Sequence, residues 1–216
     1  MFTIVLSTIV INSNMLLNEL LDLVEDHKWK CREVTNNGLF FYASFAAADI
    51  DKRYIFTPDL KKKMGIPEDT NSFYDQKNKA VVYERLFNLT IMSLCSDIEY
   101  FFKEFLGLLI PDEIKDEHIS FFHNMEKITK KMEETAFFDF KGNKKDIQNI
   151  FECFQVRHIS THNMGYVDTD FSKKIENTFN VGEKYIVDEK TYQRFYQSYT
   201  AILDNISKSL EKLKVN

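Results

Sequence analysis

Apolar side chains recur at helical spacing over the stretch from residue 79 to residue 109. They step by three and four positions, as one face of an amphipathic helix does, at Phe87, Ile91, Leu94, Ile98, Phe102, Phe105 and Leu109. Pro111 cannot continue such a helix, because proline lacks a backbone N–H and its ring clashes with the preceding turn. The pattern therefore predicts one long, buried helix that ends shortly before Pro111.

Four further segments show the same period. They are predicted to be helices over residues 15–28, 113–134, 144–162 and from Asp188 onward. Gly165 follows the third of them and can close it, because glycine readily adopts the left-handed backbone of a helix cap.

The segment between residues 29 and 56 lacks a clear helical period. Asn36-Asn37-Gly38 is a turn signal between two short apolar runs, so a short β-hairpin is expected there. A loop that carries the lysine run 61–63 is expected next, because prolines and a glycine punctuate residues 58–67. A short extended piece is expected at 184–187.

The predicted fold is all-α. An antiparallel bundle of four to five helices is expected over residues 77–214, after an extension over 1–76 that holds the first helix and the hairpin. Six glycines and three prolines in 216 residues are few for a β-sandwich or barrel, which needs many turns. The 20 phenylalanines and 10 tyrosines indicate a core rich in aromatic rings.

The net charge of −5 argues against a general nucleic-acid-binding surface, for which a basic domain is expected. The lysines between residues 127 and 145 alternate with acids, which is typical of a solvated surface. Three cysteines without close spacing are typical of a reducing compartment, so a cytoplasmic protein is expected. The apolar residues 1–11 are too few to span a bilayer and lack a positive leader, so no membrane partner is expected.

One arginine and two histidines fall close together near the end of the predicted helix over 144–162, as Arg157, His158 and His162. Histidine titrates near neutral pH and arginine stays charged, so this set suits work on a phosphate. On an ideal helix the two histidines share a face that continues the apolar stripe, so they are expected to point into the bundle or an interface. Arg157 lies about 140° from His162. It reaches the same ligand only through its length, through distortion near Gly165, or from a second copy of the helix.

Two interpretations other than phosphate chemistry are open. The three side chains can be satisfied polar groups at a helix C-terminus, where cations favour the helix dipole. Alternatively, the His-x3-His spacing can supply two ligands to a zinc ion. The third ligand would then come from a residue at no recognised spacing, such as Asp168, His118, His123 or Glu99.

The motif also resembles the Arg-x4-His motif of HEPN domains, a family of small helical proteins that includes many metal-independent RNases. Arg157, His158 and His162 match that pattern in register. The trailing segment 163–168 and the helix around residues 96–103 look like the corresponding segments of prokaryotic, defence-related members. The resemblance covers roughly residues 77–214.

The resemblance implies a HEPN-like bundle that acts without a metal or cofactor as an endoribonuclease, in the role of a toxin or antiviral defence effector. Arg157 and His162 would be catalytic, with His158 as a further proton-transfer or phosphate-positioning group. Asn163 is expected to bind or support the substrate, and Glu99 to orient an imidazole or Arg157. RNA as substrate, a homodimer through the helix that bears the motif, and an antitoxin or regulatory partner are also implied. The alternative is a non-catalytic HEPN-type module that binds a nucleotide or a partner protein.

Overall fold

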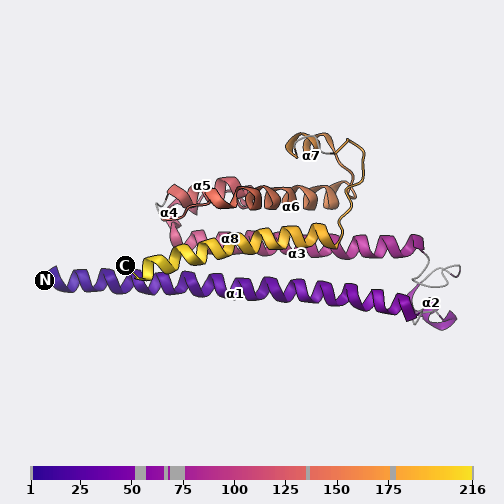
Figure 1. Cartoon of the computed structure of the whole chain (residues 1–216), viewed down its shortest axis with the longest axis horizontal. Helices are drawn as coiled ribbons and strands as arrows, with labels where there is room; N and C mark the ends of the chain where they lie inside the picture. The colour runs from indigo at the N-terminus through magenta and orange to yellow at the C-terminus, as the bar shows by residue number, and fades with distance from the viewer. Residues whose placement is uncertain are drawn as a thin grey trace.

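The protein is a stack of long helices (Figure 1). The computed structural model describes the backbone of residues 2–51, 57–65, 68, 76–134, 137–175 and 179–215. Within these ranges the all-α prediction is confirmed, since no strand is present. The extended piece expected at 184–187 is reduced to a single antiparallel bridge between Tyr166 and Lys184.

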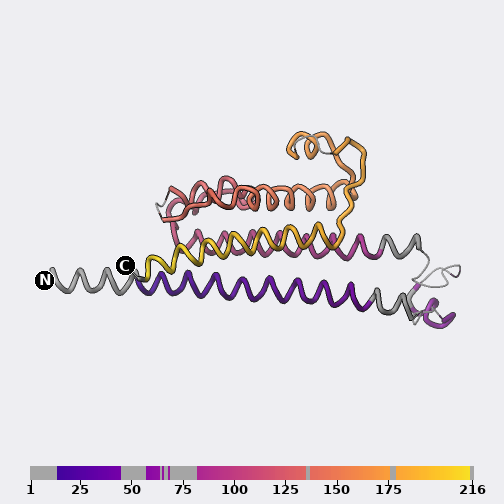
Figure 2. The backbone as a smooth tube through the Cα atoms, in the orientation of Figure 1, coloured from indigo at the N-terminus to yellow at the C-terminus, as the bar shows by residue number. Residues whose placement is uncertain are grey.

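Four helices form the main layers. They are α1 (Phe2–Asp51), α3 (Gln76–Leu109), α6 (Lys144–His162) and α8 (Glu189–Val215). In Figure 2, α1 lies on one side, α3 and α8 lie together in the middle, and α6 lies on the other side. The chain runs along α3 and α8 in one direction and along α1 and α6 in the other, so the packing is antiparallel as predicted. The predicted bounds of α3, α6 and α8 agree with the structure to within three residues.

The hairpin expected at Asn36-Asn37-Gly38 is wrong, because α1 continues through these residues without a break. Tertiary packing decides the conformation here. Thr35 is buried and its hydroxyl forms a 2.8 Å hydrogen bond with the hydroxyl of Tyr192 on α8. Gly38 lets α1 approach α3 closely, since a Cβ at this position would lie only 3.2 Å from Cγ2 of Thr90. The two asparagines face solvent, so their turn preference is not expressed.

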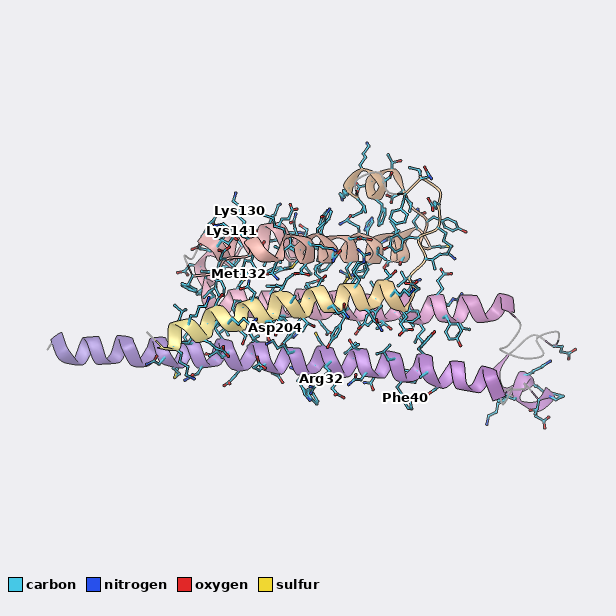
Figure 3. The ribbon with its side chains drawn as sticks, viewed as in Figure 1. Arg32, Phe40, Lys130, Met132, Lys141 and Asp204 are labelled. Atoms are coloured by element: carbon cyan, nitrogen blue, oxygen red, sulfur yellow. The ribbon has the colours of Figure 1, made fainter. Side chains whose placement is uncertain are left out.

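The same helix buries one face and exposes the other. Leu17, Leu20 and Val24 lie in the core between α3 and α8. Arg32 and Phe40 point away from the bundle on the opposite side (Figure 3). α1 therefore shares the core of the bundle, and the expected domain division near residue 77 stays a prediction.

The loop expected around the lysine run is also wrong, because residues 58–64 form a short helix, α2 (Pro58–Met64). Pro58 occupies its first turn, where the missing N–H costs nothing. The hydroxyl of Thr57 accepts a hydrogen bond from the backbone N–H of Leu60 at 3.3 Å. Gly65, with a positive φ, closes the helix. Each signal used to predict a loop is also a signal for a helix end.

The single helix predicted over 113–134 is wrong as well. It is divided into α4 (Pro111–Ile114), the 3-10 turn η1 (Ile119–His123) and α5 (Met125–Glu134). His118 accepts a hydrogen bond from the N–H of Ser120 and starts η1. Asn124 then caps α5, because its Oδ1 accepts from the N–H of Lys127 at 3.1 Å. Two local caps thus break the helix and turn His123 toward α6. A second 3-10 turn, η2 (Lys141–Asn143), leads into α6.

The core is aromatic, as the composition indicated. Phe101, Phe102, Phe105 and Tyr199 pack ring against ring with almost no exposed surface. Cys95 and Cys153 are buried as free thiols at the seam between α3 and α6, with their sulfur atoms 3.5 Å apart. Both cysteines therefore serve as small apolar residues of the core. In the described part of the chain, no helix is long and apolar enough to cross a membrane.

His27 is buried in this core and gives stability a pH dependence. Its Nε2 lies 3.4 Å from the sulfur of Cys31, and its ring packs against those of Phe101 and Tyr199. Burial, with a smaller contribution from the charge of Lys30, lowers the pKa of His27 to about 4. The folded protein therefore keeps this imidazole neutral under conditions in which the unfolded chain binds a proton.

We expect the free energy of unfolding to fall by about 2 kcal/mol between pH 7 and pH 5 on account of His27. The stabilising effect is fully present above the unfolded pKa of about 6.5 and is lost as the pH falls toward 4. Urea unfolding of the wild type and His27→Leu at both pH values would measure it. The variant should lose less stability on acidification, whereas His118→Asn, at an exposed histidine, should behave like the wild type. Equal slopes for all three proteins would contradict the assignment.

Candidate functional site

The C-terminal end of α6 is fixed by a tight turn. The backbone N–H groups of Asn163 and Gly165 both donate to the carbonyl of Ile159, at 2.8 and 2.9 Å. Gly165 adopts a φ of 82°, so it closes α6 in the left-handed conformation as predicted. The amide of Asn163 donates to the carbonyl of Tyr166 at 2.6 Å. In this structure Asn163 therefore supports the turn, and its role toward a substrate stays a prediction.

A groove of about 540 Å³ runs beside the last three turns of α6. His158 and His162 line it with their ring centroids 4.8 Å apart. Both are exposed, so the expectation that they point into the bundle is wrong for the single chain. Phe154 is buried, whereas beyond it this side of α6 borders the groove, so the two histidines are left accessible. Whether an interface covers the two rings stays a prediction.

Arg157 lines the same groove. Helical geometry directs it away from His162, but its length brings the guanidinium to Glu99 on α3, with Nη1 3.6 Å from Oε2. Arg157, His158 and His162 thus line one groove within a single chain, and which of the three ways brings them to a common ligand stays a prediction. Glu99 is mostly buried, with 17% of its side chain exposed, so it holds the guanidinium at the edge of the groove.

Glu99 also contacts an imidazole, as expected, but the imidazole is that of His123. The Nε2 atom of His123 lies 2.8 Å from Oε2 of Glu99. The ring of His123 stacks on Phe154 of α6, with centroids 5.3 Å apart and planes inclined by 24°. Glu99 thus joins Arg157 and His123, which come from two different elements.

His123 is the site residue that the sequence failed to reveal as a partner of the motif. The sequence presents it only as a distant candidate metal ligand, because no spacing relates it to Arg157 or His162. The helix expected over 113–134 would also have placed it on a regular helical face. Its position depends on the caps formed by His118 and Asn124, and these are visible in the sequence only as two polar residues of suitable type.

The far end of the groove is formed by α7 (Thr169–Lys174). Its carboxylate Asp170 forms an ion pair with Lys174 at 2.7 Å. The hydrogen bond from Lys174 lowers the pKa of Asp170, and the charges of Lys174 and His158 act in the same direction. This wall therefore places one acid and one base next to the two histidines of α6.

The candidate zinc ligands are engaged elsewhere. Asp168 caps α7, since its Oδ1 accepts from the N–H of Phe171 at 2.7 Å. His118 binds Ser120, and Glu99 binds Arg157 and His123. Across the ranges that the structure describes, no three His, Cys, Asp or Glu side chains gather closely enough to hold a metal ion. The carboxylate next to His158 and His162, that of Asp170, is paired with Lys174 and does not complete such a group.

The groove brings together the groups needed for proton transfer and for binding an anion. Arg157 offers a forked, permanently charged donor. His123, His158 and His162 offer three imidazoles, the group that most often serves as general acid or base. The arrangement suits a reaction in which charge develops on phosphate oxygens. Comparisons of the chain with protein-family models, with curated proteins and with solved structures give no match.

Proposed function

We propose that the protein is a metal-independent endoribonuclease. In this reaction the ribose 2′-hydroxyl attacks the neighbouring phosphate, which leaves a 2′,3′-cyclic phosphate and a 5′-hydroxyl. RNA carries its own nucleophile, so proton transfer and charge stabilisation are the tasks left to the protein. The observation that carries the proposal is the presence of Arg157, His158 and His162 in one open groove.

The roles follow from the chemistry of each side chain. Arg157 stabilises the negative charge that builds up on the phosphate oxygens in the transition state. His162 transfers a proton to or from the reacting oxygens, the usual task of an imidazole in general acid–base catalysis. His158 lies next to His162 and to the wall formed by Asp170 and Lys174, where it positions the phosphate.

The family in this proposal is HEPN. The motif lies at the end of α6, on a long helix packed antiparallel to α3 and followed by the amphipathic helix α8, in the order that the resemblance implies. The physiological role that accompanies this family is that of a toxin or antiviral defence effector. An antitoxin or another regulatory partner would then restrain the activity.

A homodimer belongs to the same proposal. Large apolar side chains are exposed near the end of α6, among them Met164 and Tyr166, with 82% and 44% of their surface accessible. Ser160 and Thr161 contact Asn88 and Met92 of α3, so the exposed Leu89 lies on the helix next to this end. Apolar surface of this kind is often an interaction site. A two-fold axis near residues 157–166 would bring two grooves together.

The alternative is a helical module that binds a nucleotide or a partner protein without catalysis. A closed, apolar surface around the motif would favour it. The groove is instead open and lined by ionisable side chains, which favours the endoribonuclease.

The decisive test is cleavage of a mixed-sequence RNA by the purified wild-type protein in excess EDTA. We expect cleavage to continue after chelation and to leave cyclic-phosphate and 5′-hydroxyl ends. The products can be identified by mass spectrometry, and their 5′-hydroxyl ends should accept a labelled phosphate from a kinase without prior phosphatase treatment. Sedimentation of the same sample reports whether two copies associate. If a folded dimer cleaves no RNA, the binding module is favoured. If EDTA abolishes cleavage, the interpretation of the two histidines as zinc ligands is favoured.

A further inference from the structure

His123 lies outside the motif of Arg157, His158 and His162 in the sequence, but it lines the same groove in the structure. We propose that His123 is the general acid of the ribonuclease reaction and that Glu99 is its positioning residue. This inference rests on the proposed function and assigns to it a proton-transfer group that comes from a different element. The observations that carry it are the 2.8 Å contact between His123 and Glu99 and the presence of His123 in the wall of the groove.

The geometry of the reaction requires two proton-transfer groups on different sides of the phosphorus. In an in-line displacement the attacking and leaving oxygens lie on opposite sides of it. His158 and His162 lie one turn apart with their rings in contact, so both approach a phosphate from the same side. One of them can act on the attacking oxygen, and the other cannot then reach the leaving oxygen.

His123 lies on the other side of Arg157 along the groove. Its ring stacks on Phe154, which precedes Arg157 on α6, whereas His158 and His162 follow it. Positions 154 and 162 are about 12 Å apart along the helix axis at a rise of 1.5 Å per residue. This span accommodates a phosphate over Arg157 with a hydrogen bond of about 2.8 Å at each end.

Glu99 determines which ring nitrogen of His123 is available. An ionised carboxylate only accepts hydrogen bonds, so the Nε2 atom that contacts Glu99 must carry a hydrogen. The other nitrogen, Nδ1, is left for the substrate. The stack on Phe154 fixes the plane of the ring. Glu99 itself lies behind the two side chains it holds, because most of its surface is buried.

The step balances with these two histidines. His162 accepts the proton of the 2′-hydroxyl while that oxygen forms a bond to phosphorus. The bond from phosphorus to the 5′-oxygen breaks, and the leaving oxygen takes the proton from Nδ1 of His123. His162 ends protonated and His123 neutral, and both return to their starting forms by exchange with water. The hydrogen bond from His123 to Glu99 persists throughout.

The role of a general acid can be tested with a changed leaving group. An RNA in which sulfur replaces the 5′-oxygen at one linkage leaves as a thiolate, which needs no proton because thiols are far more acidic than alcohols. We expect His123→Phe to lower cleavage of ordinary RNA by about 10²- to 10⁴-fold and cleavage of the sulfur-containing RNA by less than about 10-fold. His162→Ala should lower cleavage of both substrates.

The variants are chosen to keep the fold. Phenylalanine at position 123 retains a ring to stack on Phe154, and Arg32→Ala serves as the control because this exposed side chain on α1 does not line the groove. Arg32→Ala should cleave both substrates at the wild-type rate. Glu99→Gln should show the same preference for the sulfur substrate in smaller measure, with a loss of about 10-fold or more on ordinary RNA. A merely structural role would lower both rates equally.

The outcomes separate this inference from the proposed function. If the wild type cleaves both substrates and His123→Phe cleaves ordinary RNA equally fast, the role of His123 is overturned and the endoribonuclease stands. An equal loss on both substrates would also overturn the acid assignment. If the wild type cleaves neither substrate, the proposed function itself has failed.

Discussion

Arg157→Ala is expected to lower the rate of RNA cleavage by about 100- to 1000-fold, the usual effect of removing one donor that stabilises charge in a transition state. The guanidinium lies at the edge of the groove with 32% of its side chain exposed, so its loss should leave the fold intact. Single-turnover cleavage with saturating protein measures the chemical step separately from RNA binding.

Two further variants make this result specific. Arg157→Lys keeps the charge but loses the forked geometry, so it should recover only part of the rate. Arg32→Ala removes an exposed arginine from the outer side of α1, away from the groove (Figure 3), and should leave the rate unchanged. Equal losses in both alanine variants would show that overall charge, rather than the site, is responsible.

Arg194→Met is expected to lower the free energy of unfolding by about 3 kcal/mol. Arg194 on α8 forms a two-pronged ion pair with Glu152 on α6, at 2.6 and 2.8 Å. Tyr185 donates a third hydrogen bond to the same carboxylate at 2.7 Å. Only 13% of the Glu152 side chain is exposed, so removing its partner leaves a poorly solvated charge. The midpoint temperature of thermal unfolding should fall by roughly 6–12 °C.

The double variant Arg194→Met, Glu152→Gln provides the control for this second prediction. Glutamine keeps an acceptor for the hydroxyl of Tyr185 and removes the charge that the single variant strands. We expect the double variant to recover more than half of the lost stability. If it is no more stable than Arg194→Met, the loss comes from packing of the long arginine side chain on Phe195 and not from the unpaired carboxylate.

The sequence predicted those helices whose apolar period is long and uninterrupted. α3, α6 and α8 were placed correctly because each repeats its buried face over many turns. The second half of α1 was missed because its helical conformation depends on partners far away in the sequence. Thr35 bonds Tyr192, and Gly38 packs on Thr90. The conformational preferences of individual residues carry no information about such distant contacts.

The candidate site likewise has one part that the sequence predicted and another that it did not. The proximity of His158 to His162, and the approach of Glu99 to Arg157, follow from helical spacing and from two long helices lying side by side. The exposure of the two histidines does not, because they border a groove whose other walls come from residues distant in the sequence, such as His123 and Lys174. The arrival of His123 beside Glu99 depends on the break at residues 115–124, which the apolar pattern of that segment conceals.

The contact between Cys95 and Cys153 has a consequence for the reacting groups. Cys95 precedes Glu99 on α3 by one turn, and Cys153 precedes Arg157 on α6 by one turn. Because α3 and α6 run antiparallel, Glu99 and Arg157 lie to either side of this contact between two small side chains, and their ion pair spans it. A bulkier residue at either position would force the backbones apart, since a packed core has no room to absorb it. The distance that the Arg157 side chain must span and the orientation of the His123 ring would then change together. The volume available in the core therefore constrains the geometry of the reacting groups.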